Sequence, residues 1–273
     1  MPLAHRASSA PQPVGPLLRD WRARRRLSQL ELALDVGVST RHLSFIETGR
    51  SRPSPHMLLA LADRLDVPLR ERNRLLLAAG YAPRYAEHTL DEPALEAAHA
   101  ALQRLLAAHD PYPGLVLDRQ WNVVLANRAA HRLTALLPET FRPAPLNIFR
   151  ASLHPQGFAA LTANFDEWGG HLLDTLQRVA LRTGDPGLLA LEQEVLAYPN
   201  VQSLRARRGP AQSGGVPPVL LPCIVQLPSG MLSMFTTLTT FGSPHDVTLA
   251  ELCVELFYPS DAASETLLRS MPD

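Results

Sequence analysis

The spacing of apolar residues divides the chain into a helical N-terminal part and a mixed C-terminal part. Between residues 16 and 80, leucines recur at intervals of three and four, which is the period of amphipathic helices. The pattern predicts five helices, which begin near Pro16, Gln29, Thr40, Pro55 and Pro68. No clear period follows until Pro93, so we predict a domain over residues 15–82, a linker over 83–93 and a second domain over 94–273.

The second and third helices are bounded by strong local signals. Ser28 and Ser39 each precede a run of helix formers, as N-cap residues do. Gly37 lies between the two helices and can take a positive φ, so the chain can turn sharply there. The apolar faces predicted to pack together are Leu30, Ala33 and Leu34 in helix 29–36 and Val38, Leu43 and Ile46 in helix 40–48. This arrangement predicts a helix-turn-helix.

The polar residues left on the outer face of helix 40–48 are of the types that read DNA. Arginine can pair bidentately with guanine, and Thr and Ser can bond to several bases. Helix N-termini can hold phosphates, and arginines in an exit loop can contact the backbone. The candidate DNA-binding residues are Gln29, Ser39, Thr40, Arg41, Ser44, Phe45, Arg50 and Arg52. A basic outer face on the first helix, formed by Arg22, Arg24, Arg25 and Arg26, is expected to add attraction for the backbone.

This segment resembles the lambda-repressor-like, or XRE, family of DNA-binding domains. The matching residues are Gln29-Leu-Glu-Leu-Ala33, Gly37-Val-Ser39, Ile46-Glu47, Gly49 and Pro53. The resemblance implies a double-stranded DNA operator as partner. Because one helix-turn-helix buries little DNA surface, a homodimer on a near-palindromic operator is expected. A bundle of short amphipathic helices that binds protein instead is the alternative.

The distribution of charge agrees with a nucleic-acid-facing N-terminal part. The net charge of the whole chain is zero, but residues 1–85 contain 14 Arg and 7 acidic residues, a balance of +7. The remainder therefore carries −7. Such asymmetry favours one half that contacts nucleic acid and one half that does not.

The second domain has the pattern of an α+β fold. Two short strands over residues 115–126 turn at Asp118 to Gln120 and lead into a helix that begins at Asn127. Further helices are predicted near 156–168, 172–182, 186–196 and 261–269, with an irregular stretch at 205–218 and strands at 219–226, 232–240 and 249–258. In the last strand, alternation places Leu252, Val254, Leu256 and Tyr258 on one face and Glu251, Cys253 and Glu255 on the other. We therefore predict a five-stranded antiparallel sheet with helices against one face.

That order of elements resembles a PAS-like sensor fold and, more narrowly, the MmyB-like family of bacterial regulators. The motifs are the segment from Leu117 to Ala130, the sequence Asn-Ile-Phe-Arg at 147–150, a helix with Trp168 and the sequence Leu-Phe-Tyr-Pro-Ser-Asp at 256–261. The resemblance implies a one-component regulator whose second domain encloses a small lipophilic molecule such as a fatty acid. The chain departs from the family pattern in the loop 205–218. Candidate ligand-binding residues are Trp121, Asn127, His131, Phe149, Phe165, Trp168 and Phe235, although such aromatic residues more often belong to an ordinary core than to a pocket.

Sequence motifs give little support to catalysis or metal binding. The ten histidines show no HxH or HExxH spacing, and no GxSxG, P-loop or GxGxxG occurs. We expect no catalytic residues, no metal and no other cofactor, no membrane association and a cytoplasmic location. The two cysteines, Cys223 and Cys253, are not in a CxxC pair and are expected to be small buried residues, with a redox pair as the alternative. An enzyme domain fused to a DNA-binding module and a protein-interaction module are the rival interpretations.

Overall fold

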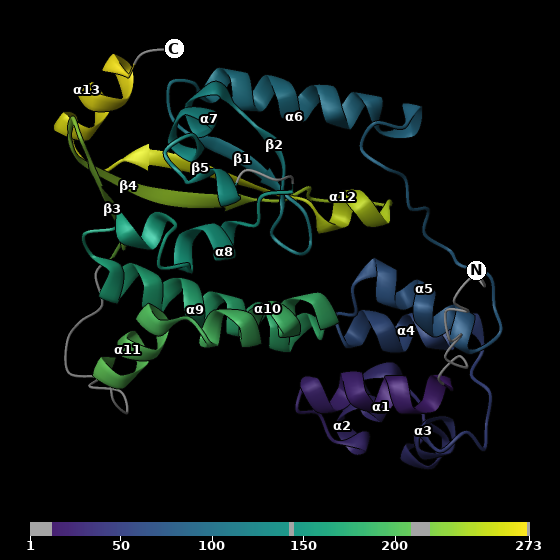
Figure 1. Cartoon of the computed structure of the whole chain (residues 1–273). Helices are drawn as coiled ribbons and strands as arrows, with labels where there is room; N and C mark the ends of the chain where they lie inside the picture. The colour runs from purple at the N-terminus through teal and green to yellow at the C-terminus, as the bar shows by residue number, and fades with distance from the viewer. Residues whose placement is uncertain (1–12, 142–144, 209–218, 272–273) are drawn as a thin grey trace, which may run out of the picture. The chain divides into compact units, whose positions relative to one another are not determined.

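The computed structural model describes residues 13–141, 145–208 and 219–271, and the chain divides into two compact units (Figure 1). Unit 1 consists of residues 1–87 together with 245–250, and unit 2 consists of residues 88–244 together with 251–273. The predicted linker, residues 83–93, spans the point where the first unit gives way to the second. Each unit has its own buried core.

Unit 1 contains the five predicted helices, and their bounds agree with the sequence pattern to within two residues. They are α1 (Val14–Arg24), α2 (Gln29–Val36), α3 (Thr40–Glu47), α4 (Pro55–Arg64) and α5 (Leu69–Ala78). The predicted caps are present: the Ser28 and Ser39 hydroxyls accept hydrogen bonds from the backbone N–H groups of Glu31 and His42. Gly37 has φ 74°, which lets α2 end and α3 begin at an angle.

The buried face of α2 differs from the prediction. Leu30 and Leu34 are 57% and 69% exposed, whereas Leu32 and Ala33 are buried against the rest of the core. The sequence of this helix offers two overlapping apolar stripes, and α2 packs against α3 and α4 through the one that contains Leu32. The assignment of Leu30 and Leu34 to the packed face was therefore wrong, while that of Ala33, Leu43 and Ile46 is confirmed.

Close approach of α1 to α3 depends on a glycine that the sequence pattern left outside the first helix. A Cβ on Gly15 would lie 2.5 Å from the carbonyl oxygen of Glu47 and 2.6 Å from that of Ile46. Real Cβ atoms do not approach backbone oxygens this closely, so any larger residue would push the two helices apart. Gly15 lies inside α1, which begins at Val14, two residues before the predicted start.

Unit 2 is built on the predicted five-stranded antiparallel sheet, whose order is β2-β1-β5-β4-β3. The strands are β1 (Gly114–Leu117), β2 (Val123–Ala126), β3 (Cys223–Leu227), β4 (Gly230–Thr239) and β5 (Cys253–Pro259). Helix α6 lies on one side of this sheet, and α8 and α9 lie on the other (Figure 1). The predicted α+β class and the five-stranded antiparallel sheet are confirmed, but helices lie on both faces of the sheet and not on one face as predicted.

The helices of unit 2 follow the prediction only in part. They are α6 (Glu96–His109), α7 (Arg128–Thr134), α8 (Ile148–Leu153), α9 (Phe165–Thr183), α10 (Pro186–Leu196), α11 (Pro199–Arg208) and α13 (Ala262–Ser270), whereas α12 (Val247–Glu251) lies mostly in the segment 245–250 of unit 1. Among the described residues, short 3-10 helices occur at η1 (Pro93–Leu95), η2 (Glu139–Phe141) and η3 (Phe158–Ala160). Residues 205–208, expected to be irregular, end α11, and the rest of that stretch up to residue 218 lies outside the described residues. Residues 249–251, expected to begin the last strand, belong to α12.

Two of these differences have clear physical causes. The predicted helix 156–168 was wrong because part of this segment pairs with the sheet edge: the N–H of Ala163 donates to Ile224 O, and the N–H of Gln226 donates to Leu161 O. The predicted break between residues 168 and 172 does not occur, and α9 runs through it. A Cβ at Gly169 would lie 2.8 Å from the ring of Phe165, so this glycine permits close packing within the helix and does not end it.

Candidate functional site

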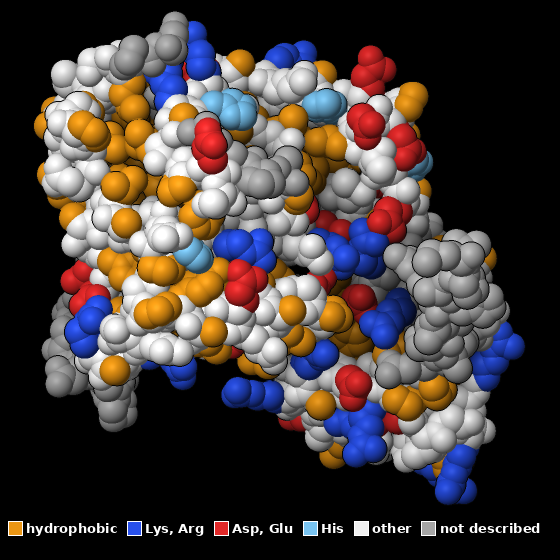
Figure 2. Space-filling view, viewed as in Figure 1, with side chains coloured by type: hydrophobic (Ala, Val, Ile, Leu, Met, Phe, Trp, Pro, Cys, Tyr) orange, Lys and Arg blue, Asp and Glu red, His pale blue; other side chains and the backbone are white. Residues whose placement is uncertain are grey.

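Helix α3 presents a polar face to solvent while its other face anchors the helix in unit 1. Leu43 and Ile46 have no exposed surface. On the outer side, Arg41 is exposed and Ser44 and Phe45 are half-buried. The side chains predicted to contact base edges therefore lie on the accessible face of a firmly packed helix, and arginines project from the surface of this unit (Figure 2).

Phe45 brings two of the candidate arginines together. The guanidinium of Arg41 lies 5.3 Å from the centroid of the Phe45 ring, and that of Arg50 lies 5.9 Å from it. Such cation–π contacts limit the conformations of long side chains. The helix residue expected to read a base and the loop residue expected to contact the backbone are thus oriented by one aromatic ring.

Two candidate DNA contacts have partners inside the protein. The Gln29 amide donates to Glu47 Oε2 at 2.7 Å. The Arg52 guanidinium donates to the carbonyl oxygen of Gly80 at 3.2 Å and lies 4.5 Å from the ring centroid of Tyr81. Both side chains therefore hold elements of unit 1 together, and their contact with phosphate stays a prediction.

The predicted basic outer face of α1 is smaller than expected. Arg22 points inward and donates two hydrogen bonds to Glu47, from Nε at 2.6 Å and from Nη2 at 2.8 Å. Arg25 is half-buried and donates to the carbonyl oxygens of Leu65 and Asp66. Arg24 and Arg26 are exposed. The inclusion of Arg22 in a solvated basic face was wrong, because a buried carboxylate in α3 requires a cationic partner.

Glu47 is the centre of this buried polar cluster. Its side chain accepts from Arg22 in α1 and from Gln29 in α2, and the residue itself is the last of α3. Burial alone would raise the pKa of Glu47, but the hydrogen bonds from Arg22 and Gln29 and the charge of Arg22 outweigh it, so that pKa is lowered. The first three helices are therefore joined through one ionised carboxylate.

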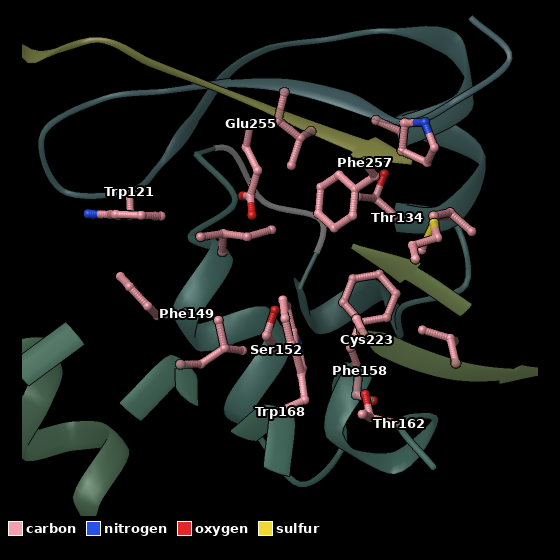
Figure 3. Close-up of a pocket in the computed structure, with 18 residues that line it drawn as sticks. Trp121, Thr134, Phe149, Ser152, Phe158, Thr162, Trp168, Cys223, Glu255 and Phe257 are labelled. Atoms are coloured by element: carbon pink, nitrogen blue, oxygen red, sulfur yellow. Dashed lines mark hydrogen bonds between the residues drawn. The ribbon is translucent and has the colours of Figure 1, made fainter. Parts of the chain in front are cut away.

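Unit 2 contains a largely apolar cavity between the sheet and the helices α7, α8 and α9 (Figure 3). Its volume is about 80 Å³. Three predicted ligand-binding residues line it: Trp121 from the β1–β2 turn, Phe149 from α8 and Trp168 from α9. The Trp121 and Phe149 rings are in contact, with centroids 4.7 Å apart. Aromatic rings from separate elements thus form one pocket wall, as in sites for small molecules.

The other four predicted ligand-binding residues have different positions. Asn127 is a buried N-cap of α7, which accepts from the backbone N–H groups of Gly114 and Ala130. His131 is exposed on α7. Phe165 packs in the core around α9, and Phe235 stacks on Tyr258, with ring centroids 5.4 Å apart. The structure therefore brings three of the seven residues together at the cavity.

Comparison with known families matches both parts of the chain. The profile described as "MmyB-like transcription regulator ligand binding domain" matches residues 98–271, and a helix-turn-helix profile matches residues 18–72. The chain belongs to the MmyB-like transcription regulator family. The two resemblances seen in the sequence are thereby confirmed, and the protein is a DNA-binding transcription regulator with a ligand-binding domain.

Other comparisons add little to this assignment. No curated protein matches the sequence. The solved structure of an RNA-binding Light-Oxygen-Voltage receptor aligns over 98% of this chain and 66% of that chain, with 14% sequence identity and a TM-score of 0.24. This regulator thus spans 66% of that receptor's length, and a similarity of this size supports no argument. Within the described part of the regulator, no helix is long and apolar enough to cross a membrane.

Polar residues of the family motif 117–130 position Trp121 in the regulator. The Asp118 carboxylate accepts from the backbone N–H groups of Gln120 and Asn122, and the Asn147 amide donates to Gln120 O at 2.7 Å. These bonds hold Trp121 at φ 65°, a conformation that non-glycine residues seldom adopt. The motif therefore fixes the turn that carries one wall of the cavity.

The acidic cavity-lining residue that sequence reasoning missed is Glu255. Alternation along the strand placed Glu255 on the face opposite Val254 and Leu256. In the structure, the face that carries Glu255 lines the cavity. Glu255 is 7% exposed, and burial raises its pKa to about 7 against the opposing effect of a hydrogen bond with Thr236. Alternation alone assigns residues to two faces of a strand and does not tell which face is enclosed, because both faces of this sheet are covered by helices.

Of the two cysteines expected to be buried, Cys223 is buried and Cys253 is only partly so. Cys223 is buried in the cavity wall, and Cys253 is half-buried in β5. Burial raises the pKa of Cys223 to about 12 and that of Cys253 to about 11, with a further contribution from the charge of Glu255. Both side chains are therefore protonated thiols at neutral pH, which disfavours the reactivity that a redox pair requires.

Proposed function

We propose that this regulator is a one-component, cytoplasmic transcription factor that binds a near-palindromic operator as a homodimer and responds to a small, largely apolar ligand. The observation that carries the DNA-binding part is the accessible face of α3, where Arg41 and Arg50 flank Phe45 on a helix anchored by Leu43 and Ile46. Two such helices, one helical turn apart on the operator, would supply the affinity that one lacks.

The cavity of unit 2 supports the ligand-binding part of the proposal. Its lining is mostly aromatic and aliphatic, which suits an apolar molecule. A fatty acid is the ligand that the family resemblance suggests. An engineered cavity of about 150 Å³ holds benzene. The cavity of unit 2 has a volume of about 80 Å³, so it would have to widen around a long acyl chain. Ligand binding would then favour one arrangement of the lining over another, as a population shift requires.

The segment 245–250 connects strands of unit 2 to unit 1, which supports coupling between ligand binding and DNA binding. Residues 245–250 lie in the sequence between β4 and β5 but belong to unit 1. There the N–H of Val247 donates to Ala86 O at 2.8 Å, and the N–H of Tyr85 donates to Asn73 Oδ1 in α5 at 3.0 Å. A shift of β5, which carries Glu255 into the cavity wall, would therefore be transmitted directly to a segment held by the helical unit.

Arg41 and Arg50 should contribute differently to DNA binding. Arg41→Ala is expected to weaken operator binding by about 1–3 kcal/mol and to relax the preference at one base position, because it removes a bidentate base contact. Arg50→Ala should weaken binding to all sequences alike and lower the salt slope by about one, because it removes a phosphate contact. In vitro selection with random duplexes, followed by salt titration, measures both effects.

Arg41→Ala and Arg50→Ala are a matched pair, because both arginines contact the ring of Phe45. If the two variants lose affinity equally on selected and scrambled DNA and select the same sites as the wild type, α3 does not read bases through Arg41.

Turnover of lipid or acyl-CoA substrates by the full chain would instead favour the enzyme alternative. Stable capture of a protein partner together with weak DNA binding would favour the interaction-module alternative.

A further inference from the structure

The cavity of unit 2 carries a carboxyl group inside an otherwise apolar wall. Among its described lining residues, Glu255 is the acidic one, and none is Arg, Lys or His. The remaining polar lining side chains carry hydroxyl, thiol or indole groups, and one of them is the hydroxyl of Ser152 on α8. A carboxylate in this position thus has no charged partner among the residues that form the described wall.

Strand register explains why Glu255 faces the cavity. On β5, Glu255 pairs with Leu115 of β1 and Leu238 of β4, and the side chain of Phe257 follows on the same face. Leu115 and Phe257 both line the cavity. In the close-up, the Glu255 carboxyl points from β5 into the space bounded by Trp121, Ser152 and Phe257 (Figure 3). The group is 7% exposed, so a polar group of a ligand would meet it out of contact with bulk water.

The neighbours of Glu255 do not neutralise its charge. Cys223 comes from β3, Cys253 is two residues away on β5, and the charge of Glu255 contributes to the raised pKa of both thiols. A hydrogen bond with the Thr236 side chain favours the ionised form of Glu255. Burial outweighs this bond and raises its pKa to about 7. An ionised Glu255 is therefore costly in this largely apolar wall and would be stabilised by a cation or a strong donor.

We propose that the cavity binds a lipophilic amine, whose ammonium group donates hydrogen bonds to the Glu255 carboxylate while its apolar body packs against Trp121, Phe149 and Trp168. This inference deepens the proposed function and rests on it for the role of the cavity. The aromatic rings add cation–π attraction for the same charge. An anionic fatty acid would place a second carboxylate beside Glu255, and the pair would have to share a proton.

A series of three ligands of equal chain length separates these chemistries. Hexylamine, hexanoate and hexanol are titrated at pH 8 into the full-length wild type, into Glu255→Gln and into Ser152→Ala, a matched polar change in the same cavity. Binding is followed by calorimetry and by the fluorescence of Trp121 and Trp168, which line the site. At this pH the amine is protonated.

The wild type is expected to bind hexylamine about 10- to 100-fold more tightly than hexanoate, since a charged hydrogen bond contributes about that factor. Glu255→Gln should lose this preference and keep its affinity for hexanol, and Ser152→Ala should keep the preference. Lowering the pH from 8 to 6 should weaken amine binding to the wild type, because protonation removes the carboxylate, and should leave the variant unaffected.

Three results would overturn the proposal: hexanoate binding as tightly as hexylamine, an unchanged amine preference in Glu255→Gln, or no hexylamine binding at all. The hexanol control shows whether Glu255→Gln retains a folded cavity. Operator selection and its dependence on Arg41 do not involve this group. A failure of the amine chemistry with intact DNA selection would therefore refute the inference and leave the proposed DNA-binding function in place.

Discussion

Replacing Glu47 with alanine is expected to destabilise unit 1 by about 3–5 kcal/mol, the usual cost of removing one member of a buried ion pair. The substitution would leave the Arg22 guanidinium, which is 14% exposed, without the carboxylate that it contacts at 2.6 Å. It would also remove the acceptor of the Gln29 amide. Because the cluster joins α1, α2 and α3, the loss should also reduce operator binding.

Hydrogen–deuterium exchange along a urea series can measure this effect in unit 1 separately from unit 2. The exposed ion pair of Arg64 and Asp35 is the matched control, because its side chains are 46% and 38% exposed. Asp35→Ala should change the free energy of unfolding by less than about 1 kcal/mol. Equal effects of Glu47→Ala and Asp35→Ala would show that the buried cluster does not hold the three helices together.

The pH dependence of this cluster follows from the lowered pKa of Glu47. A carboxyl with a lower pKa in the folded state stabilises the protein above its unfolded pKa, and this stabilisation is lost as the pH falls through the folded value. The difference in stability between wild type and Glu47→Ala should therefore have its full size at neutral pH. It should shrink at acidic pH values below the ordinary pKa of a glutamate.

The stability of Glu255→Gln relative to the wild type should depend on pH in the opposite sense to that of Glu47→Ala. The folded pKa of Glu255 is about 7, against 4.5 as its ordinary value, so the unfolded state releases this proton first as the pH rises. Between pH 4.5 and 7 the ligand-free wild type should lose about 3 kcal/mol relative to Glu255→Gln, and the difference should then stay constant. The variant is thus expected to gain relative stability at pH 8.

The same exchange experiment, at pH 5 and at pH 8 and read from peptides of unit 2, tests this expectation. Glu167→Gln, an exposed change on α9 beside Trp168, is the matched control and should give no such change with pH. A constant difference between wild type and Glu255→Gln over this range would mean that Glu255 does not titrate near neutral pH, and the account of a costly buried charge would be wrong.

Sequence patterns predicted the elements whose signals are local. Ser28, Gly37 and Ser39 determine the boundaries of α2 and α3 through caps and a positive φ, and these do not depend on distant residues. The β1–β2 hairpin and the closing strands followed from short apolar runs between turns. The number of strands and their antiparallel pairing followed from the sequence of elements, whereas the strand order β2-β1-β5-β4-β3 was not predicted.

The details that failed depend on which partner a residue meets in the fold. Leu30 and Leu32 are both leucines in one helix, and only the packing against α3 and α4 decides that Leu32 is buried. Arg22 and Glu47 are 25 residues apart, so their pairing has no local signature. Glu255 looked like an ordinary polar position on a strand, and the enclosing helices make it part of a cavity wall.

Protection of operator guanines from methylation at N7 tests the central claim, that α3 reads base edges in the major groove. With wild-type protein on a selected operator, we predict protected guanines in two half-sites about 10 base pairs apart, because Arg41 would occupy the N7 and O6 acceptors. Arg41→Ala should lose this protection, and Arg50→Ala should retain it at saturating protein. Unprotected guanines with the wild type, or the same protection with Arg41→Ala, would contradict the claim.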